Sequence, residues 1–171
     1  MRVKVLTINV QNNEGGDARR IALLNRGLRD ISPDLVAFQE VIRTDQGDQL
    51  AELLDGTGLH GTHQSEVMAY QPPWTDRYGG SALATRWPHR IVEVLDLRSA
   101  DARDVPWCTL AAIVALPELG ELLFIATTTS WRPEAEAARE RQVVAIADLD
   151  ARHRRTLPTI IAGDLNASPD A

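Results

Sequence analysis

The chain has 171 residues, 44% of them hydrophobic, which is enough apolar material for one domain with its own core. Its formal net charge of −6 at pH 7 excludes the broad basic surface that indiscriminate binding to nucleic acid or anionic membranes requires. The single cysteine, Cys108, excludes an intrachain disulfide, and its apolar surroundings predict a buried thiol.

The sequence shows no segment of the kind that directs a protein to a membrane. The N-terminal apolar run is too short for a secretory signal and lacks a cleavage site of small residues. No run reaches the roughly 18 apolar residues of a membrane span. We therefore expect one domain over residues 1–171, in a monomeric and cytoplasmic protein.

The first part of the chain alternates between strand and helix patterns. Alternating β-branched residues predict strands, and apolar residues that recur every three to four positions predict helices. An Asp side chain accepts hydrogen bonds from the free N–H groups that begin a helix, so Asp residues are candidate caps. The expected elements are a strand at 3–8, a helix from Asp17 to 31, a strand at 35–40 and a helix at 46–54 capped by Asp45.

The second part is richer in strands and ends with a long helix and a last strand. Residues 60–80 mix a possible strand with a proline-containing loop. The turn at 117–120 joins two apolar runs and predicts an antiparallel hairpin. The expected elements are strands at 81–85, 91–97, 108–116 and 121–128, a helix with Pro133 in its first turn, and a strand that ends near 166. Together these elements predict a mixed α/β layered domain.

Three predicted strands end in the same way, with a carboxylate or a carboxamide directly after apolar residues. These polar residues are Asn9, Gln39 with Glu40, and Asp164 with Asn166. If the strands are neighbours with aligned ends, the side chains converge on one pocket. Oxygen ligands with no His or Cys nearby suit Mg²⁺ or Mn²⁺. Each residue taken alone is equally typical of an ordinary turn.

Four segments in this order resemble the endonuclease/exonuclease/phosphatase superfamily of DNase I-like, magnesium-dependent phosphoesterases. The segments are "VLTINV" (5–10), "PDLVAFQEV" (33–41), "YGGSALATRWP" (78–88) and "IIAGDLNASPD" (160–170). They match the strand with the metal-site Asn, the motif with the metal-binding Glu, the Gly-containing strand and the G-D-x-N motif of that family. The resemblance implies a two-sheet β-sandwich flanked by helices.

The resemblance also implies a role for each matching residue. Glu40 would bind Mg²⁺ or Mn²⁺, and Asn9 would orient or join the metal site. Asp164 would position or deprotonate the attacking water, and Asn166 would steady the phosphoryl oxygens. The implied reaction is an in-line displacement at the phosphorus of a phosphate ester. Family members often carry an Arg and a Gln on the long helix, here Arg139 and Gln142, although a solvated helix face explains these two equally well.

The chain departs from the family pattern in two places. Many relatives have a His within the strand that reads Thr127–Thr129 here, and a Thr hydroxyl can donate a hydrogen bond but carries no charge. The family's closing Ser-Asp-His motif has no counterpart before Ala171, and we expect structural or surface roles for the histidines His60, His63, His89 and His153. We therefore expect a truncated domain whose second sheet is incomplete, with an unpaired edge and uncovered apolar faces on 91–97 or 108–116.

Three functions remain open from the sequence. The first is a magnesium-dependent phosphoesterase that acts on a phosphate-ester substrate, which the sequence does not narrow to nucleic acid, nucleotide or phospho-metabolite. The second is a catalytically inactive remnant that keeps a metal-binding or phosphate-binding surface. The third is a protein-interaction module whose acidic strand ends are solvated turns. The basic segment at 152–155 is expected to be a solvated helix end, and the four tryptophans are too dispersed for a base-stacking platform.

Overall fold

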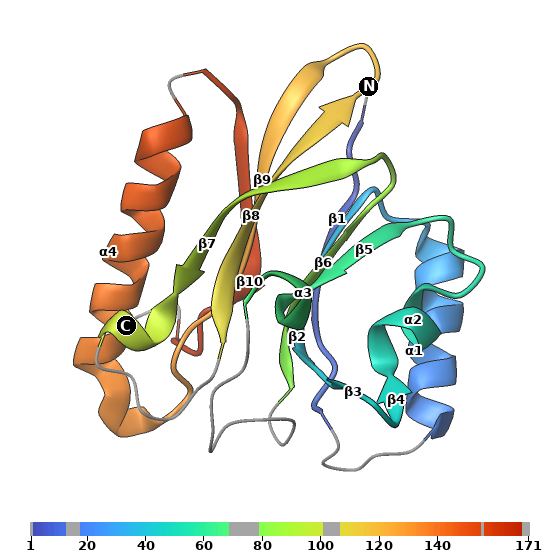
Figure 1. Ribbon diagram of the computed structural model, residues 1–171, viewed down its shortest axis with the longest axis horizontal. Coiled ribbons are helices and arrows are strands. Elements are labelled where there is room, and N and C mark those ends of the chain that lie inside the picture. Colours follow the sequence, from blue (N-terminus) through green and yellow to red (C-terminus); the bar gives the residue numbers. More distant parts are fainter. Residues whose placement is uncertain (1, 13–17, 69–78, 101–106, 155, 169–171) are drawn as a thin grey trace.

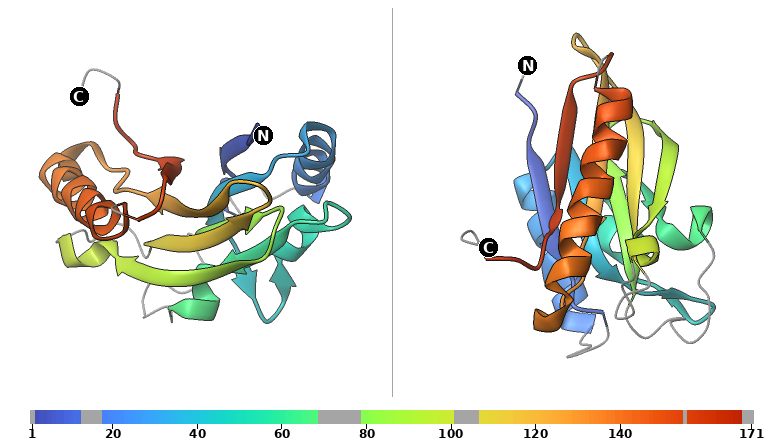
Figure 2. Two further views of the ribbon diagram at one scale, coloured as in Figure 1. Left: turned by 90° about the horizontal axis from the view of Figure 1, so that it is seen from above. Right: turned by 90° about the vertical axis from the view of Figure 1, so that its left-hand side faces the viewer.

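The fold is a four-layer sandwich, described here from a computed structural model that places residues 2–12, 18–68, 79–100, 107–154 and 156–168. Two mixed sheets pack face to face, and helices cover their outer faces (Figures 1 and 2). Helices α1 (Ala18–Ile31) and α2 (Gln49–Leu54) cover one sheet, and α4 (Glu136–His153) covers the other. The predicted helix-flanked sandwich is confirmed. No described helix is long and apolar enough to cross a membrane.

The first sheet has the strand order β1-β2-β6-β5. The strands β1 (Val5–Asn9) and β2 (Leu35–Val41) are parallel, because α1 forms the crossover between them. The strands β6 (Gly80–Thr85) and β5 (His60–His63) continue the sheet in antiparallel fashion. The polar ends of β1 and β2 therefore lie at the same edge, with Asn9 opposite Gln39.

The second sheet has the order β10-β9-β8-β7, and it contains the predicted hairpin. The strands are β7 (His89–Asp96), β8 (Cys108–Leu116), β9 (Gly120–Thr128) and β10 (Thr159–Asp164), and a 3-10 turn (Leu97–Ala100) follows β7. The helix α4, preceded by a 3-10 turn (Pro133–Ala135), is the crossover that makes β10 parallel to β9. Neither sheet is closed, so β1 and β10 are both edge strands.

The main core lies between the two sheets. It includes Leu35 and Leu83 from the first sheet and Leu110 and Phe124 from the second, all fully buried. Burial of each such side chain contributes about 1.5–3 kcal/mol to stability.

The expectation that 108–116 has an uncovered apolar face is wrong, because the second face of β8 packs under α4 through residues such as Ile113. Within the described strands, the large apolar side chains that are exposed, Val5 and Ile161, lie on the edge strands β1 and β10. Cys108 is buried, as predicted, and this burial raises the pKa of its thiol.

The segment between β2 and α2 differs from the prediction. Arg43–Thr44 (β3) and Gly47–Asp48 (β4) form a small hairpin, so the helix begins at Gln49 and not before it. Its cap is Asp48, whose carboxylate accepts a hydrogen bond from the N–H of Ala51 at 3.0 Å. The prediction of Asp45 as the cap is therefore wrong, because the hairpin turn occupies that residue. Asp17, the other predicted cap, lies outside the described residues.

Gly27 lies inside α1 and offers a test of the helix assignment. A Cβ added there meets no atom within 4 Å. We expect Gly27→Ala to raise the free energy of unfolding by about 0.5–1 kcal/mol, because alanine restricts the unfolded chain and favours the helix. Urea denaturation at pH 7.5 measures the change, and a loss of stability would contradict the open space around this glycine.

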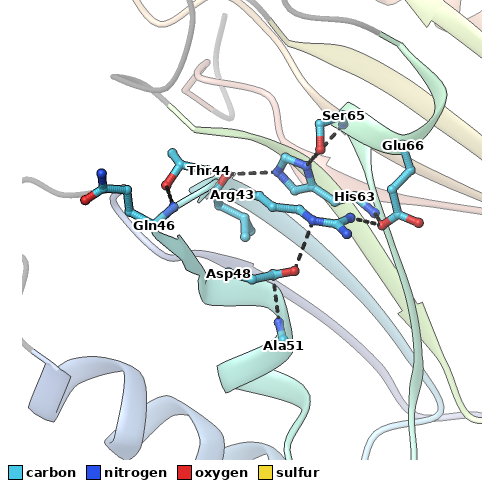
Figure 3. Close-up of polar contacts among 9 residues, drawn as sticks. Arg43, Thr44, Gln46, Asp48, Ala51, His63, Ser65 and Glu66 are labelled. Carbon is cyan, nitrogen blue, oxygen red and sulfur yellow. Dashed lines mark hydrogen bonds and ion pairs between the residues drawn. The ribbon is translucent and has the colours of Figure 1, made fainter.

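His63 is a structural residue buried at the start of α3 (Gln64–Val67), a short helix that the sequence did not predict (Figure 3). Its Nδ1 lies 3.1 Å from the N–H of Ser65 and 2.8 Å from its hydroxyl. Its Nε2 lies 3.0 Å from the carbonyl oxygen of Val41. This arrangement requires a neutral ring, with Nδ1 as acceptor and Nε2 as donor. Burial lowers the pKa of His63 below its ordinary value, outweighing the Val41 hydrogen bond.

Acidification should therefore destabilise the fold. The unfolded chain protonates His63 near pH 6.5, whereas the folded chain resists protonation until a lower pH. The unfolded state then binds more protons, so the free energy of unfolding should fall as the pH drops from 7.5 to 5.5. Urea titrations at both pH values measure this loss. His63→Gln should reduce the dependence, and a folded His63→Gln variant with the same dependence as the unchanged chain would contradict this explanation.

Candidate active site

The predicted polar strand ends meet in an open pocket of about 440 Å³ between the edges of the two sheets. Residues 7–9 of β1 and Gln39 of β2 line one side of the pocket, and residues 163–167 at the end of β10 line the other. The edge strands β1 and β10 contact each other across the sandwich. Asn9, Gln39, Asp164 and Asn166 therefore line one pocket, although their strands come from two different sheets. Glu40 does not line the pocket and is connected to it through its hydrogen bond with Asn9.

Asn9 links the two carboxylates of the site. Its Nδ2 donates to Glu40 Oε1 at 2.9 Å and contacts Asp164 Oδ2 at 3.3 Å. Its Oδ1 accepts a hydrogen bond from the N–H of Gln11 at 2.8 Å, which fixes the orientation of the amide. Asn9 thus presents its nitrogen to the carboxylates in this geometry, which fits an orienting role.

Glu40 lies on a β-bulge. The pairing of β2 with β6 shifts register between Phe38 and Val41, and Glu40 has a φ of +59°. A Cβ at Gly79, which also has a positive φ, would lie 2.5 Å from the Glu40 carbonyl carbon. The bulge therefore needs glycine at this position, and this explains the first glycine of the "GGSALAT" segment.

Asp164 is held by the chain that follows it. Its Oδ1 accepts a hydrogen bond from the N–H of Asn166 at 3.0 Å. The Asn166 Nδ2 donates to the Thr129 carbonyl at 2.9 Å, and the Thr129 N–H donates to the Asp164 carbonyl at 3.0 Å. The G-D-x-N motif and the end of β9 therefore form one hydrogen-bonded unit. The side-chain nitrogen of Asn166 points into this unit.

Unusual backbone conformations gather at the site. Four non-glycine residues around it have positive φ, namely Gln11, Asn12, Glu40 and Asn166. Such conformations cost about 1–3 kcal/mol each and persist where the surrounding structure enforces them. They cluster at functional sites, so this observation supports a functional assignment for the pocket.

The threonines that stand in place of the family's histidine are turned into the protein. Thr127, Thr128 and Thr129 are at most 1% exposed. The Thr127 hydroxyl pairs with that of Thr109 at 2.6 Å, and the Thr129 hydroxyl donates to the Leu165 carbonyl. These hydroxyls support the strand ends and are not presented to a substrate.

Arg139 and Gln142 hold the loop after β9. Both side chains are buried, so the solvated-face interpretation is wrong. Gln142 accepts a hydrogen bond from the Ser130 N–H at 2.9 Å, and Arg139 donates to the Ser130 and Arg132 carbonyls. Neither residue lines the pocket, so both act on the site only through the backbone that follows β9.

The histidines, the described basic residues at the end of α4 and the described tryptophans do not line the pocket. Arg152 and His153 pair with Glu93 of β7, and the hydrogen bond from Arg152 is the main cause of the lowered pKa of Glu93. His89 hydrogen-bonds to Thr62 and Thr85. None of the four histidines lines the pocket, as expected. Trp107 is buried and Trp131 is 47% exposed, whereas Trp74 lies outside the described residues.

The donor set fits a hard divalent cation that takes few protein ligands. Within the described ranges, no group of three or more His, Cys, Asp or Glu residues can share a metal. Mg²⁺ is commonly bound through one or two carboxylates and completes its shell with water and substrate oxygens. Glu40 and Asp164, which share the amide of Asn9, provide such a pair.

The sequence interpretation missed Asn12. This residue is 5% exposed, and its Nδ2 donates to Glu40 Oε2 at 2.6 Å. It stands in a polar loop next to another asparagine, so nothing in the local sequence distinguishes it from a solvated turn residue.

Several solved structures share the fold of this chain. Human Nocturnin, whose catalytic domain was solved with bound sulfate, aligns at a TM-score of 0.75 and 21% identity, covering 98% of this chain and 65% of that one. TDP2 of D. rerio, solved with a single-stranded DNA product, aligns at a TM-score of 0.67 and 18% identity, and the alignment covers 97% of this chain and 61% of that one. ANGEL2, a 2',3'-cyclic phosphatase, aligns at a TM-score of 0.70 and 15% identity, and the alignment covers 98% of this chain and 53% of that one.

At these identities the structural likeness shows the fold alone. The chain spans less than two thirds of the length of each of these three structures. No curated protein matches the sequence. The model of the Endonuclease/Exonuclease/phosphatase family matches residues 6–171, nearly the whole chain. The protein therefore belongs to the endonuclease/exonuclease/phosphatase family.

Proposed function

We propose that this protein hydrolyses a phosphate ester with the help of Mg²⁺ or Mn²⁺ bound at Glu40. The observation that carries the proposal is the single amide of Asn9 within 3.3 Å of two carboxylates from different sheets. Two carboxylates so close repel each other, and a divalent cation between them and the substrate offsets that repulsion.

The side chains have distinct roles in this proposal. Glu40 holds the cation, and Asn9 sets the distance between Glu40 and Asp164. Asp164, which lines the open pocket, orients the attacking water or accepts its proton. Asn166 fixes Asp164 through its backbone N–H. The bound cation would supply stabilisation of the charge that develops on the phosphoryl oxygens.

The proposed substrate is a phosphodiester or a phosphomonoester. Nocturnin with sulfate, TDP2 with a DNA product and the cyclic phosphatase ANGEL2 support this class by analogy of fold. The net charge of −6 argues against tight non-specific binding of DNA. A small or locally recognised ester is therefore favoured over a long nucleic acid.

One observation favours a second candidate function, an inactive protein that binds a cation or phosphate. Among the described residues the pocket lacks an imidazole, and the hydroxyls of Thr127 and Thr129 are bonded inside the protein. A positioned general acid–base group contributes about 10²–10⁴-fold to rate, so its loss could leave binding without turnover.

Hydrolysis of bis-p-nitrophenyl phosphate by the purified chain, with Mg²⁺ and then with EDTA, tests the first proposal. Nicked and abasic DNA and a nucleoside 2',3'-cyclic phosphate extend the test to larger esters. Mg²⁺-dependent release of product supports the enzyme. Binding of Mn²⁺ without turnover supports the second candidate, and the lack of both would overturn the site assignment.

A further inference from the structure

We infer that Asn12 is a positioning residue that aims the Glu40 carboxylate, an inference that rests on the proposed cation site. Two hydrogen bonds join the residues: Asn12 Nδ2 donates to Glu40 Oε2 at 2.6 Å, and the Asn12 N–H donates to the Glu40 carbonyl at 3.0 Å. Asn12 therefore fixes both the side chain and the backbone of Glu40.

Asn12 is itself held by the two helices on its side of the sheet. Its carbonyl accepts hydrogen bonds from Arg20 of α1 at 2.9 Å and from Gln49 of α2 at 3.2 Å. Its side chain is buried, and its φ of +37° lies in a region that asparagine tolerates better than most residues. The loop after β1 is thus locked by its surroundings at the point where it meets Glu40.

Gln49 links Asn12 to the segment that follows Glu40. Its side-chain oxygen accepts a hydrogen bond from the Ile42 N–H at 2.8 Å, and its backbone N–H donates to the Ile42 carbonyl at 3.0 Å. Its side-chain nitrogen donates to Asn12. One glutamine therefore connects the residue that contacts the carboxylate with the segment that follows the bulge.

The arrangement gives the carboxylate a defined orientation. Asn9 donates to Glu40 Oε1 and Asn12 donates to Oε2, one amide on each oxygen. The terminal torsion angle of a Glu side chain otherwise varies over a wide range, so two fixed donors remove most of the rotational freedom of the carboxylate. A carboxylate has about four lone-pair sites, so both oxygens keep acceptor capacity for a cation.

Asn12→Gly isolates this role, because glycine accepts a positive φ and removes only the side-chain donor. The Mn²⁺ affinity of the full chain is measured by titration, with the free Mn²⁺ concentration followed by electron paramagnetic resonance. Circular dichroism checks that the variant is folded. We expect Mn²⁺ affinity to fall about 10–100-fold, the usual effect of losing a partner of a metal ligand. The Mg²⁺ concentration for half-maximal hydrolysis should rise similarly, excess Mg²⁺ should restore kcat, and KM for the substrate at saturating Mg²⁺ should not change.

Gln11→Gly is the matched control. Gln11 has a φ of +59°, lies beside Asn12 and is exposed, and glycine keeps the backbone N–H that donates to Asn9 Oδ1. This change therefore loosens the same loop without removing a donor to Asn9 or Glu40. It should bind Mn²⁺ as the unchanged chain does. Asn12→Ala provides the same test with a stiffer backbone if the glycine variant does not fold.

The outcomes separate this inference from the proposed function. If a folded Asn12→Gly or Asn12→Ala variant binds Mn²⁺ within twofold of the unchanged chain, the positioning role is wrong while the site stands. An equal loss of affinity in Gln11→Gly also overturns the role, because loop stiffness then explains the effect. If the unchanged chain binds no Mn²⁺, the proposed cation site itself fails, and the inference falls with it.

Discussion

Replacing Glu40 with glutamine is expected to lower kcat/KM for Mg²⁺-dependent hydrolysis by about 10³-fold, which corresponds to about 4 kcal/mol of transition-state stabilisation. Glutamine keeps the size of the side chain and its place on the bulge, but it removes the negative charge that holds the cation. The single carbonyl oxygen of the glutamine can still accept the hydrogen bond of Asn9, whereas the Asn12 amide, which donates to the other carboxylate oxygen, loses its acceptor. The main loss should therefore appear in catalysis and Mn²⁺ affinity, with a smaller loss of stability from the unpaired Asn12 donor.

Glu118→Gln is the control for this substitution. Glu118 also has a positive φ, at +71°, but it is exposed in the turn between β8 and β9. Its replacement should leave both Mn²⁺ binding and hydrolysis unchanged. Steady-state kinetics over a range of Mg²⁺ concentrations compare the two variants. Hydrolysis that persists at full rate in Glu40→Gln would show that the activity does not depend on this carboxylate.

Gly163→Ala is expected to reduce the free energy of unfolding by at least about 3 kcal/mol, the upper end of the usual cost of overpacking. Gly163 pairs with Thr127 across β9 and β10, and a Cβ there would lie 1.9 Å from the Thr127 carbonyl oxygen. That atom belongs to the backbone of a buried strand, so no side-chain rotation relieves the clash. The strands must separate, and Asp164, the next residue, moves with β10.

Thermal unfolding followed by circular dichroism measures the effect. For a domain of this size, 3 kcal/mol corresponds to a fall of about 6–12 °C in Tm. Gly27→Ala provides the opposite control, because the same substitution in open space should raise Tm slightly. A Gly163→Ala variant as stable as the unchanged chain would mean that β9 and β10 are not as close as the structure places them.

Local patterns in the sequence were sufficient for most elements. The β8–β9 hairpin, α4 and the strands β1, β2 and β10 follow from apolar periodicity and turn residues, and all are present. The exceptions are short. The β3–β4 hairpin and α3 contain few residues each, so no apolar repeat indicates them. An ion pair between Arg43 and Asp48 joins the two strands of the hairpin, and the His63 ring accepts a hydrogen bond from the Ser65 N–H at the start of α3.

The sequence by itself supplied the residue types of the candidate site, carboxylates and carboxamides at three strand ends, whose oxygens suit a hard cation. Only the tertiary structure decided how they meet. Asn9 and Asp164 are 155 residues apart and belong to different sheets, so their contact depends on how the two sheets pack. The bulge at Glu40, the support from Asn12 and the inward-facing Thr127–Thr129 likewise depend on neighbours distant in sequence. Local sequence patterns carry no information about such contacts, because burial and long-range hydrogen bonds produce them.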